Sequence, residues 1–142
     1  FSLITKFTNS YNSSNSRYLM LETGLSHTSS VVVSDANTAI ALGSGDMPVL
    51  ATPAMLALME NAAMLAVAAE LPEGSTTVGG QISSSHLAPS PVGAEVRARA
   101  TLEKIDGRKL YFNVIALQDD KVIGEGTHLR FIVDRERFMA KL

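Results

Sequence analysis

The longest apolar segment of the chain runs from Thr52 to Glu70 and reads TPAMLALMENAAMLAVAAE. Between its two ends, only Glu60 carries a charge. Thr52 is a residue type favoured at the N-cap, Pro53 suits the first helical turn, and the Pro- and Gly-containing residues 71–74 favour a stop. A helix that is apolar on nearly every face is buried. The pattern therefore predicts one long, buried α-helix.

Alternating patterns and turn residues predict strands on both sides of this helix. The expected strands are residues 28–34, 76–87, 92–105, 108–118 and 121–134. In residues 92–105, small or apolar side chains alternate with mostly charged ones, as in an antiparallel strand with one solvated face. The pairs at 106–107 and 119–120 mark tight turns. Gly124 and Gly126 mark a bulge or a close backbone approach in the last strand.

This order of elements predicts an α+β fold, because the helix is segregated from a run of hairpins. A single long helix wrapped by a curved antiparallel sheet is the hot-dog architecture. At this length, residues 22–142 are expected to form one hot-dog domain. The helix is apolar on more faces than one sheet can cover, so a second copy of the chain is expected to cover the rest, as a homodimer or a higher assembly.

The first 21 residues differ from the rest of the chain. They are rich in Ser and Asn, they contain Lys6 and Arg17, and they contain no acidic residue. The chain does not begin with Met, whereas Met20 is a plausible native start. These features predict a disordered, transit-like or fusion-derived arm. A cytoplasmic location is expected, with import into an organelle as the alternative if the arm is a transit peptide.

Composition excludes several classes of function. The 142 residues carry a net charge of −2, so nothing attracts nucleic acid or an anionic membrane globally. The absence of cysteine excludes disulfide scaffolds, thiol nucleophiles and Cys-zinc sites. The three histidines, His27, His86 and His128, lack metal-ligand spacing, so no metal is expected. Prolines and Glu60 interrupt the most membrane-like stretch, so no membrane span is expected either.

Three side chains are candidates for chemistry. A carboxylate inside an apolar helix must be desolvated, shifted in pKa and held by a partner, which makes Glu60 the first candidate. His86 is placed where a strand meets a Pro- and Gly-containing turn, a position often found at the rim of a cleft. Thr52 offers a hydroxyl at a helix N-terminus, although an ordinary N-cap is the simpler interpretation of this residue alone.

Three segments carry a resemblance to a known family. They are residues 43–63, which include Thr52 and Glu60, residues 86–93, which begin at His86, and residues 123–130. Together they resemble the fluoroacetyl-CoA-specific thioesterase-like family of hot-dog proteins. The resemblance covers nearly the whole chain outside the N-terminal arm.

The resemblance implies a dimeric acyl-CoA thioesterase with Thr52, Glu60 and His86 as its catalytic set. It also places Gly79 on a glycine that lines the site in this family. CoA is then part of the substrate, and no separate cofactor is expected. The N-terminal region contains nothing that matches the lid that sets substrate choice in the family's best-known member. The implied substrate is therefore a short or small acyl-CoA without a defined acyl group.

Other residues are candidates for contact with that substrate. Met55 and Met59 are most simply core residues, but they lie near Glu60 and could line an acyl pocket. His128 either packs in the last strand or points into the site, and packing is favoured. Candidates to meet the CoA phosphates are Arg97, Arg99, Lys104, Arg108, Lys109 and Arg130. For each of these, a solvated strand face is the simpler interpretation.

The residues leave the reaction partly open. Glu60 could activate water or attack the thioester, and Thr52 could orient water or be the nucleophile. His86 could pair with Glu60 or donate to the leaving thiolate. A hot-dog hydratase or dehydratase also pairs a helix carboxylate with a histidine, although it has no evident role for Thr52. A non-catalytic acyl-CoA-binding module is a third possibility, because fold does not fix function.

Overall fold

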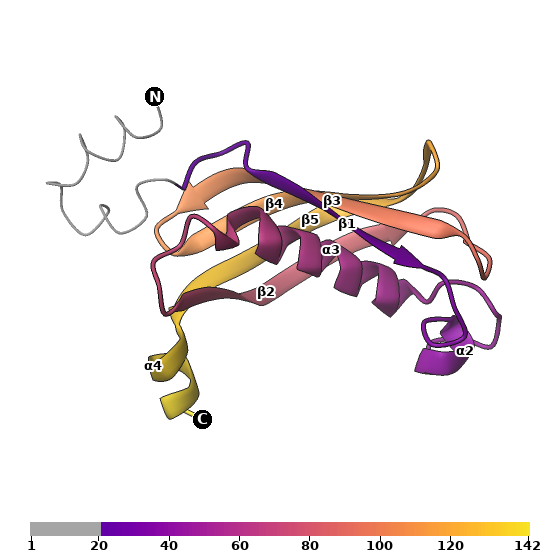
Figure 1. Ribbon diagram of the computed structural model, residues 1–142, viewed down its shortest axis with the longest axis horizontal. Coiled ribbons are helices and arrows are strands. Elements are labelled where there is room, and N and C mark those ends of the chain that lie inside the picture. Colours follow the sequence, from indigo (N-terminus) through magenta and orange to yellow (C-terminus); the bar gives the residue numbers. More distant parts are fainter. Residues whose placement is uncertain (1–20) are drawn as a thin grey trace, which may run out of the picture.

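Five antiparallel strands form one curved sheet, and a single long helix lies across its inner face (Figure 1). The computed structural model describes residues 21–142. The elements are β1 (Ser26–Val32), α2 (Ala39–Leu42), α3 (Thr52–Ala68), β2 (Ser75–His86), β3 (Glu95–Asp106), β4 (Lys109–Gln118), β5 (Lys121–Asp134) and α4 (Arg135–Ala140). The strands are hydrogen-bonded in the order β1-β3-β4-β5-β2. This is the predicted α+β hot-dog fold.

The alternation predicted for β3 explains how the sheet receives α3. Val96, Ala98, Ala100 and Leu102 are fully buried on the inner face. Their small side chains allow the helix to approach, and α3 packs chiefly against β3 and β1. The helix therefore covers one side of the sheet more closely than the side formed by β2 and β5.

One face of α3 stays uncovered in the single chain. The buried residues of the helix are Met55, Met59, Ala62, Ala63, Ala66 and Val67. Pro53, Ala57, Asn61 and Leu65 are exposed, and they follow one another at intervals of four residues. This spacing places them along one stripe of the helix surface. One sheet therefore does not cover every face of this apolar helix, as the sequence predicted, and cover of the stripe by a second copy of the chain stays a prediction.

The ends of α3 also differ from the prediction. Ala51 occupies the N-cap position and Thr52 is the first helical residue, so the predicted N-cap at Thr52 is wrong. No side chain caps the first turn. The helix ends at Ala68, two residues before the expected end at Glu70. Strand β3 begins at Glu95, three residues late, because Gly93 adopts a φ of 96° and turns the chain just before it.

The predicted turns and close approaches are confirmed. Gly107 and Asp119 have left-handed φ values of 61° and 53° in the two hairpin turns. A Cβ added at Gly124 would lie 2.7 Å from Sδ of Met55, and one at Gly126 would collide with the backbone of Ser83. The close neighbours of both glycines therefore leave no room for a side chain at either position.

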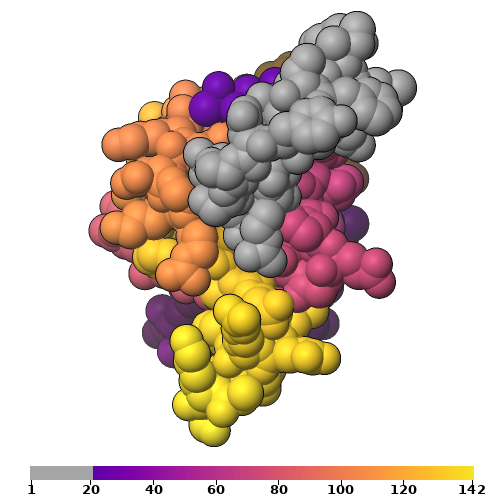
Figure 2. All heavy atoms as spheres, turned by 90° about the vertical axis from the view of Figure 1, so that its left-hand side faces the viewer, coloured from indigo at the N-terminus to yellow at the C-terminus, as the bar shows by residue number. Residues whose placement is uncertain are grey.

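Two short helices, α2 and α4, have no counterpart in the sequence prediction, because four and six residues are too few to show a helical period. Local caps hold them: Thr38 accepts a hydrogen bond from the amide of Ala41, and Asp134 accepts one from the amide of Arg137. In Figure 2 the C-terminal residues, drawn in yellow, form the foot of the molecule.

The predicted N-terminal arm lies outside the described residues, except for Leu21. That side chain is buried in the core, so the folded domain includes at least one residue that the prediction assigned to the arm. Among the helices of residues 21–142, none is long and apolar enough to cross a membrane.

Candidate active site

Thr52 and His86 form a close pair at the end of the sheet where β2 finishes. Oγ1 of Thr52 lies 2.6 Å from Nδ1 of His86. Thr52 begins α3 and His86 ends β2, so the ends of two elements meet at this point. The threonine hydroxyl is engaged with an imidazole and does not cap its own helix. The structure thus brings together two of the three predicted catalytic residues.

The second ring nitrogen of His86 is unusual. Its Nε2 atom is shielded from solvent and has no hydrogen-bond partner within residues 21–142. Buried polar atoms without a partner are uncommon, and a catalytic role is one accepted reason for them. This orphaned nitrogen and the short contact to Thr52 both make His86 a candidate functional residue.

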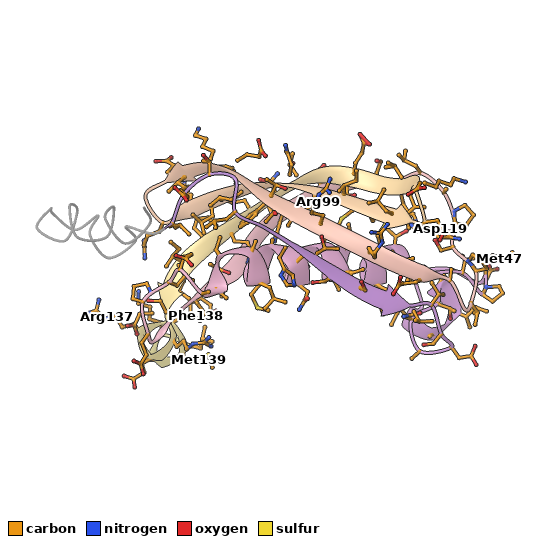
Figure 3. All side chains as sticks on the ribbon, turned by 45° about the horizontal axis from the view of Figure 1, so that its top comes forward. Met47, Arg99, Asp119, Arg137, Phe138 and Met139 are labelled. Atoms are coloured by element: carbon orange, nitrogen blue, oxygen red, sulfur yellow. The ribbon has the colours of Figure 1, made fainter. Side chains whose placement is uncertain are left out.

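A hollow of about 330 Å³ opens at the Thr52–His86 pair. Its remaining lining is mostly apolar: Ala39, Ser44, Val49, Leu50, Leu87, Ala88 and Pro89. Apolar walls around a few polar groups are typical of small-molecule sites. A larger hollow of about 770 Å³ is lined by residues of the outer face of the sheet, among them Arg99, which is labelled in Figure 3. Its lining is mostly polar and includes none of the predicted catalytic residues, so we assign the site to the smaller hollow.

Glu60 lies in the middle of α3 and meets residues of β2 and β5. Its side chain is 41% exposed, so the predicted burial of this carboxylate is not seen in the single chain. Its Oε2 atom lies 3.8 Å from Nη1 of Arg130, a basic partner that comes from β5. A Cβ added at Gly79 would lie 2.8 Å from the same oxygen. Glycine at this position therefore leaves room for the carboxylate.

Arg130 is buried beneath Glu60. Its Nε atom donates to Oγ1 of Thr77 at 2.7 Å, and Nη2 donates to the backbone oxygen of Thr77 at 2.9 Å. Burial lowers the pKa of Arg130 and the nearby Glu60 raises it, but an arginine remains charged in either case. The guanidinium is buried and faces the half-exposed carboxylate of Glu60, so contact between Arg130 and a CoA phosphate stays a prediction.

The Thr52–His86 pair and the Glu60–Arg130 pair occupy separate places in one chain. Thr52 and Glu60 are eight residues apart on α3, which corresponds to about 12 Å along the helix axis. The predicted contact between His86 and Glu60 is therefore not made within a single chain. Each chain carries two partial sites.

The other predicted substrate contacts divide into two groups. Met55 and Met59 are fully buried in the core, which agrees with the core interpretation and leaves neither side chain exposed to a ligand. Arg108 lines a hollow of about 250 Å³ together with Arg137 and Lys141. Figure 3 shows Arg137 at the end of the molecule opposite to Met47. Phosphate binding by Arg108 stays a prediction.

Two polar residues of the site were missed or underused by sequence reasoning. Thr77 accepts a hydrogen bond from Arg130. It lies two residues before Gly79 and so on the same face of β2, and this spacing could have identified Thr77 as a residue of the site. His128 is buried as expected, but its ring also contacts Arg130. No group of three or more His, Cys, Asp or Glu side chains in residues 21–142 could hold a metal ion.

Similar proteins agree with this architecture. A family model described as fluoroacetyl-CoA-specific thioesterase matches residues 33–136. The fluoroacetyl-CoA thioesterase of Streptantibioticus cattleyicolor is 38% identical over 94 residues, which are 66% of this chain and 68% of that protein.

Solved structures are also similar. The fluoroacetyl-CoA thioesterase FlK superposes with a TM-score of 0.80 at 33% identity, covering 85% of this chain and 94% of that one. A thioesterase superfamily member from Thermus thermophilus superposes with a TM-score of 0.79 at 29% identity, covering 84% and 89% of the two chains.

The fold, the site and these relatives define a hot-dog protein of the thioester hydrolase class. Since the family model spans most of the chain, the protein belongs to the fluoroacetyl-CoA-specific thioesterase family.

Proposed function

We propose that this protein hydrolyses a short or small acyl-CoA to the free acid and CoA, with Thr52, Glu60 and His86 as its catalytic residues. The observation that carries the proposal is the 2.6 Å contact between Thr52 and His86 at the floor of an apolar hollow. The family relationship supplies the reaction class. One similar structure is a variant of FlK in complex with acetyl-CoA, which supports a CoA ester as the substrate.

The reaction needs a base, a carbonyl-polarising group and a proton for the leaving sulfur. Glu60 takes a proton from water while the water oxygen attacks the thioester carbon. The tetrahedral intermediate then collapses and the C–S bond breaks. The proton that Glu60 took from water passes through the Thr52–His86 pair to the thiolate, the acid product loses its remaining proton to solvent, and Glu60 and the pair return to their starting states. The pair is suited to this step because its hydroxyl and imidazole are in a short contact through which a proton can pass.

The N-terminus of α3 is suited to stabilise the developing oxyanion. No side chain caps the first turn of α3, so its leading amides are not occupied by a cap. The amides at a helix N-terminus point outward and carry the positive end of the helix dipole. Thr52 stands at this terminus, so a thioester held at its hydroxyl would place its carbonyl oxygen close to these donors.

We further propose that a second copy of this chain completes the site. The two partial sites of one chain are about 12 Å apart along α3, and α3 carries an exposed stripe. If two α3 helices cross antiparallel, Thr52 of one chain lies opposite Glu60 of the other when the two-fold axis passes midway between these positions. That midpoint is Leu56, next to Ala57.

Ala57 supports this placement of the axis. It belongs to the exposed stripe and carries the smallest side chain on it. Small residues at a crossing point allow two helices to approach closely. The homodimer thus joins the Thr52–His86 pair of each chain to the Glu60–Arg130 pair of its neighbour.

The hollow also favours a small acyl group. Its volume of about 330 Å³ is near the lower end of the range for small-molecule sites. The connection between α2 and α3 contributes Ser44, Val49 and Leu50 to the lining of the hollow. We therefore expect acetyl and other short acyl groups to be accepted, with no special requirement for fluorine.

The experiment that tests this function is release of free CoA thiol from a series of acyl-CoAs of increasing chain length, with wild type and Glu60→Gln side by side. We expect turnover on the short esters and a loss of about 10² to 10⁴ in kcat in the variant, because the base is removed. Glu125→Ala, which removes an exposed carboxylate of β5, serves as the control and should keep full activity.

Three outcomes would contradict the proposal. A Glu60→Gln protein as active as wild type would remove Glu60 from the mechanism. Hydration of a crotonyl-type thioester without release of free thiol would instead identify a hydratase. Saturable binding of the esters without any turnover would identify a binding module.

A further inference from the structure

His128 lies in a buried polar cluster under the middle of α3. His128 and Arg130 are two residues apart on β5, so both point to the inner face of the sheet. They are 3% and 6% exposed. Nε and Nη2 of Arg130 both donate to Thr77, and only Nη1 is directed toward Glu60. A group that fixes the position of Nη1 therefore also fixes the distance between Arg130 and the carboxylate of Glu60.

The contacts of His128 permit only one protonation state. Its Nδ1 atom lies 2.7 Å from the backbone oxygen of Gln81, which can only accept, so Nδ1 carries a proton. Its Nε2 atom lies 3.2 Å from Nη1 of Arg130, which can only donate, so Nε2 carries none. The ring is therefore neutral. In the other tautomer and in the imidazolium, Nε2 would carry a proton and would point an N–H group at an N–H group of Arg130.

We propose that His128 is a positioning residue: its neutral imidazole accepts a hydrogen bond from Nη1 of Arg130 and thereby directs the guanidinium at the carboxylate of Glu60. This inference rests on the proposed function only in that Glu60 is the catalytic carboxylate. His128 acts through Arg130 and does not touch the reacting atoms.

The surroundings of His128 favour the neutral ring. The charged groups that face it are Arg130 on its own strand and Glu60 on α3, while β2 contributes the oxygen of Gln81 and β4 contributes the ring of Phe112, 6.3 Å away between centroids. Burial is the main influence and lowers the pKa of His128, and Arg130 lowers it further. The Gln81 oxygen and Glu60 act in the opposite direction, and the net result is a lowered pKa.

Gly79 shows how closely the three polar groups converge. A Cβ added there would lie 2.8 Å from Oε2 of Glu60, 3.5 Å from Cε1 of His128 and 3.6 Å from Nη1 of Arg130. The space beside Gly79 is thus bordered by the carboxylate, the imidazole and the guanidinium. Small shifts of His128 are therefore passed to Glu60 through groups already in contact.

The kinetic test compares two substitutions of His128. His128→Leu fills the space but cannot accept a hydrogen bond, so we expect kcat to fall about tenfold to a hundredfold, as when a catalytic group is misplaced by about 1 Å. His128→Gln places an amide oxygen near the former Nε2 position, and we expect it to restore kcat to within a few-fold of wild type. His27→Leu, at an exposed histidine of β1, is the matched control and should leave kcat unchanged.

A double variant separates positioning from a general packing defect. In an Arg130→Met background, His128→Leu should cause no further loss, because the residue through which it acts is already absent. An equal loss in both backgrounds would overturn the proposal, and so would a His128→Leu protein with wild-type kcat. Circular dichroism and the melting temperature verify that each variant folds.

A spectroscopic measurement on the wild-type protein does not depend on activity. The ¹⁵N chemical shifts of the imidazole of His128 should show a protonated Nδ1 and an unprotonated Nε2 at pH 7, and this state should persist below pH 6.5. A protonated Nε2 at pH 7 would overturn the assignment. If instead Glu60→Gln is fully active while these shifts are as expected, the proposed function fails and the His128–Arg130 contact stands.

Discussion

At the scale of single residues, the candidate site depends on a few short side-chain contacts and on one glycine that leaves room for a carboxylate. Oε2 of Glu60 lies 3.8 Å from Nη1 of Arg130. Gly79 has no side chain and so leaves room for this oxygen. Thr52 does not cap its helix, and its hydroxyl contacts His86 instead. Each of these roles depends on a contact of a few ångströms, so each can be tested by one substitution.

Gly79→Ala should impair catalysis more than stability. The added Cβ would lie 2.8 Å from Oε2 of Glu60, which is the end of a flexible, half-exposed side chain and can swing away. We expect the melting temperature to change little and kcat/KM to fall about tenfold to a hundredfold, because the carboxylate leaves its position. Gly80→Ala is the matched control, since its Cβ meets the ring of Phe131 and not Glu60. Equal activity of the two variants would contradict the role assigned to Gly79.

The lowered pKa of His128 predicts how stability depends on pH. An unperturbed histidine titrates near 6.5, so as the pH falls through this value the unfolded chain takes up a proton that the folded protein resists. The free energy of unfolding should therefore decrease as the pH falls from 7.5 to 5.5. His128→Gln lacks this contribution and should lose less stability over the same interval. Urea midpoints at the two pH values measure the difference, and identical losses would disprove it.

At the scale of elements, the ladder between β2 and β5 positions most of the site. Thr77 and Gly79 lie on β2, while His128 and Arg130 lie on β5. Gly79 is paired with Arg130 in the register of the two strands. A shift of one residue would turn Arg130 away from α3 and toward solvent. The register is therefore a condition for the site as well as for the fold.

Gly126→Ala should destabilise this ladder strongly. The added Cβ would overlap the backbone of Ser83 and lie 2.6 Å from Cα of Ser84, and a backbone cannot move aside without opening the strand pair. We expect the free energy of unfolding to fall by about 3 kcal/mol or more. Glu125→Ala, at the exposed neighbouring position, should change it by less than about 0.5 kcal/mol. Chemical denaturation of both variants measures this, and a Gly126→Ala protein as stable as wild type would refute the expectation.

At the scale of the whole molecule, two features of the single chain motivate the proposed homodimer. One stripe of α3 is exposed, and the two partial sites do not meet. A homodimer with antiparallel α3 helices resolves both, because it covers the stripe and brings Thr52 of one chain opposite Glu60 of the other. This assembly makes a geometric prediction that does not depend on the reaction.

Ala57→Cys should produce a disulfide-linked dimer under mild oxidation. The chain contains no cysteine, so the variant has a single thiol, and this thiol lies next to the proposed two-fold axis. Two such thiols are expected to come within the distance that a disulfide spans. Non-reducing electrophoresis detects the product. Lys121→Cys, at the exposed first residue of β5, is the control and should remain largely unlinked.

Mixing two inactive variants tests whether the site is shared. Thr52→Ala and Glu60→Gln each damage a different partial site, so a heterodimer of the two retains one site made entirely of native residues. Refolding them together should recover activity that neither has alone. If the mixture stays inactive while forming dimers, the two partial sites do not combine in the proposed way.

The elements with local signals were predictable from the sequence. The apolar run determined α3, alternation determined the inner face of β3, and Gly107 marked a hairpin because its turn requires a left-handed backbone. The candidate residues Thr52, Glu60 and His86 were also recognisable, from their chemistry within these patterns and from family resemblance. Short-range information suffices for such features because propensities and periodicity act over a few neighbouring residues.

Only the tertiary structure decided which residues meet. The contact of Thr52 with His86 spans 34 residues, and that of Glu60 with Arg130 spans 70; both depend on where α3 rests on the sheet and on the register of β2 with β5. The exposure of Glu60 likewise follows from α3 lying closer to β3 and β1. No local pattern encodes these distances, because they result from packing the whole sheet around one helix.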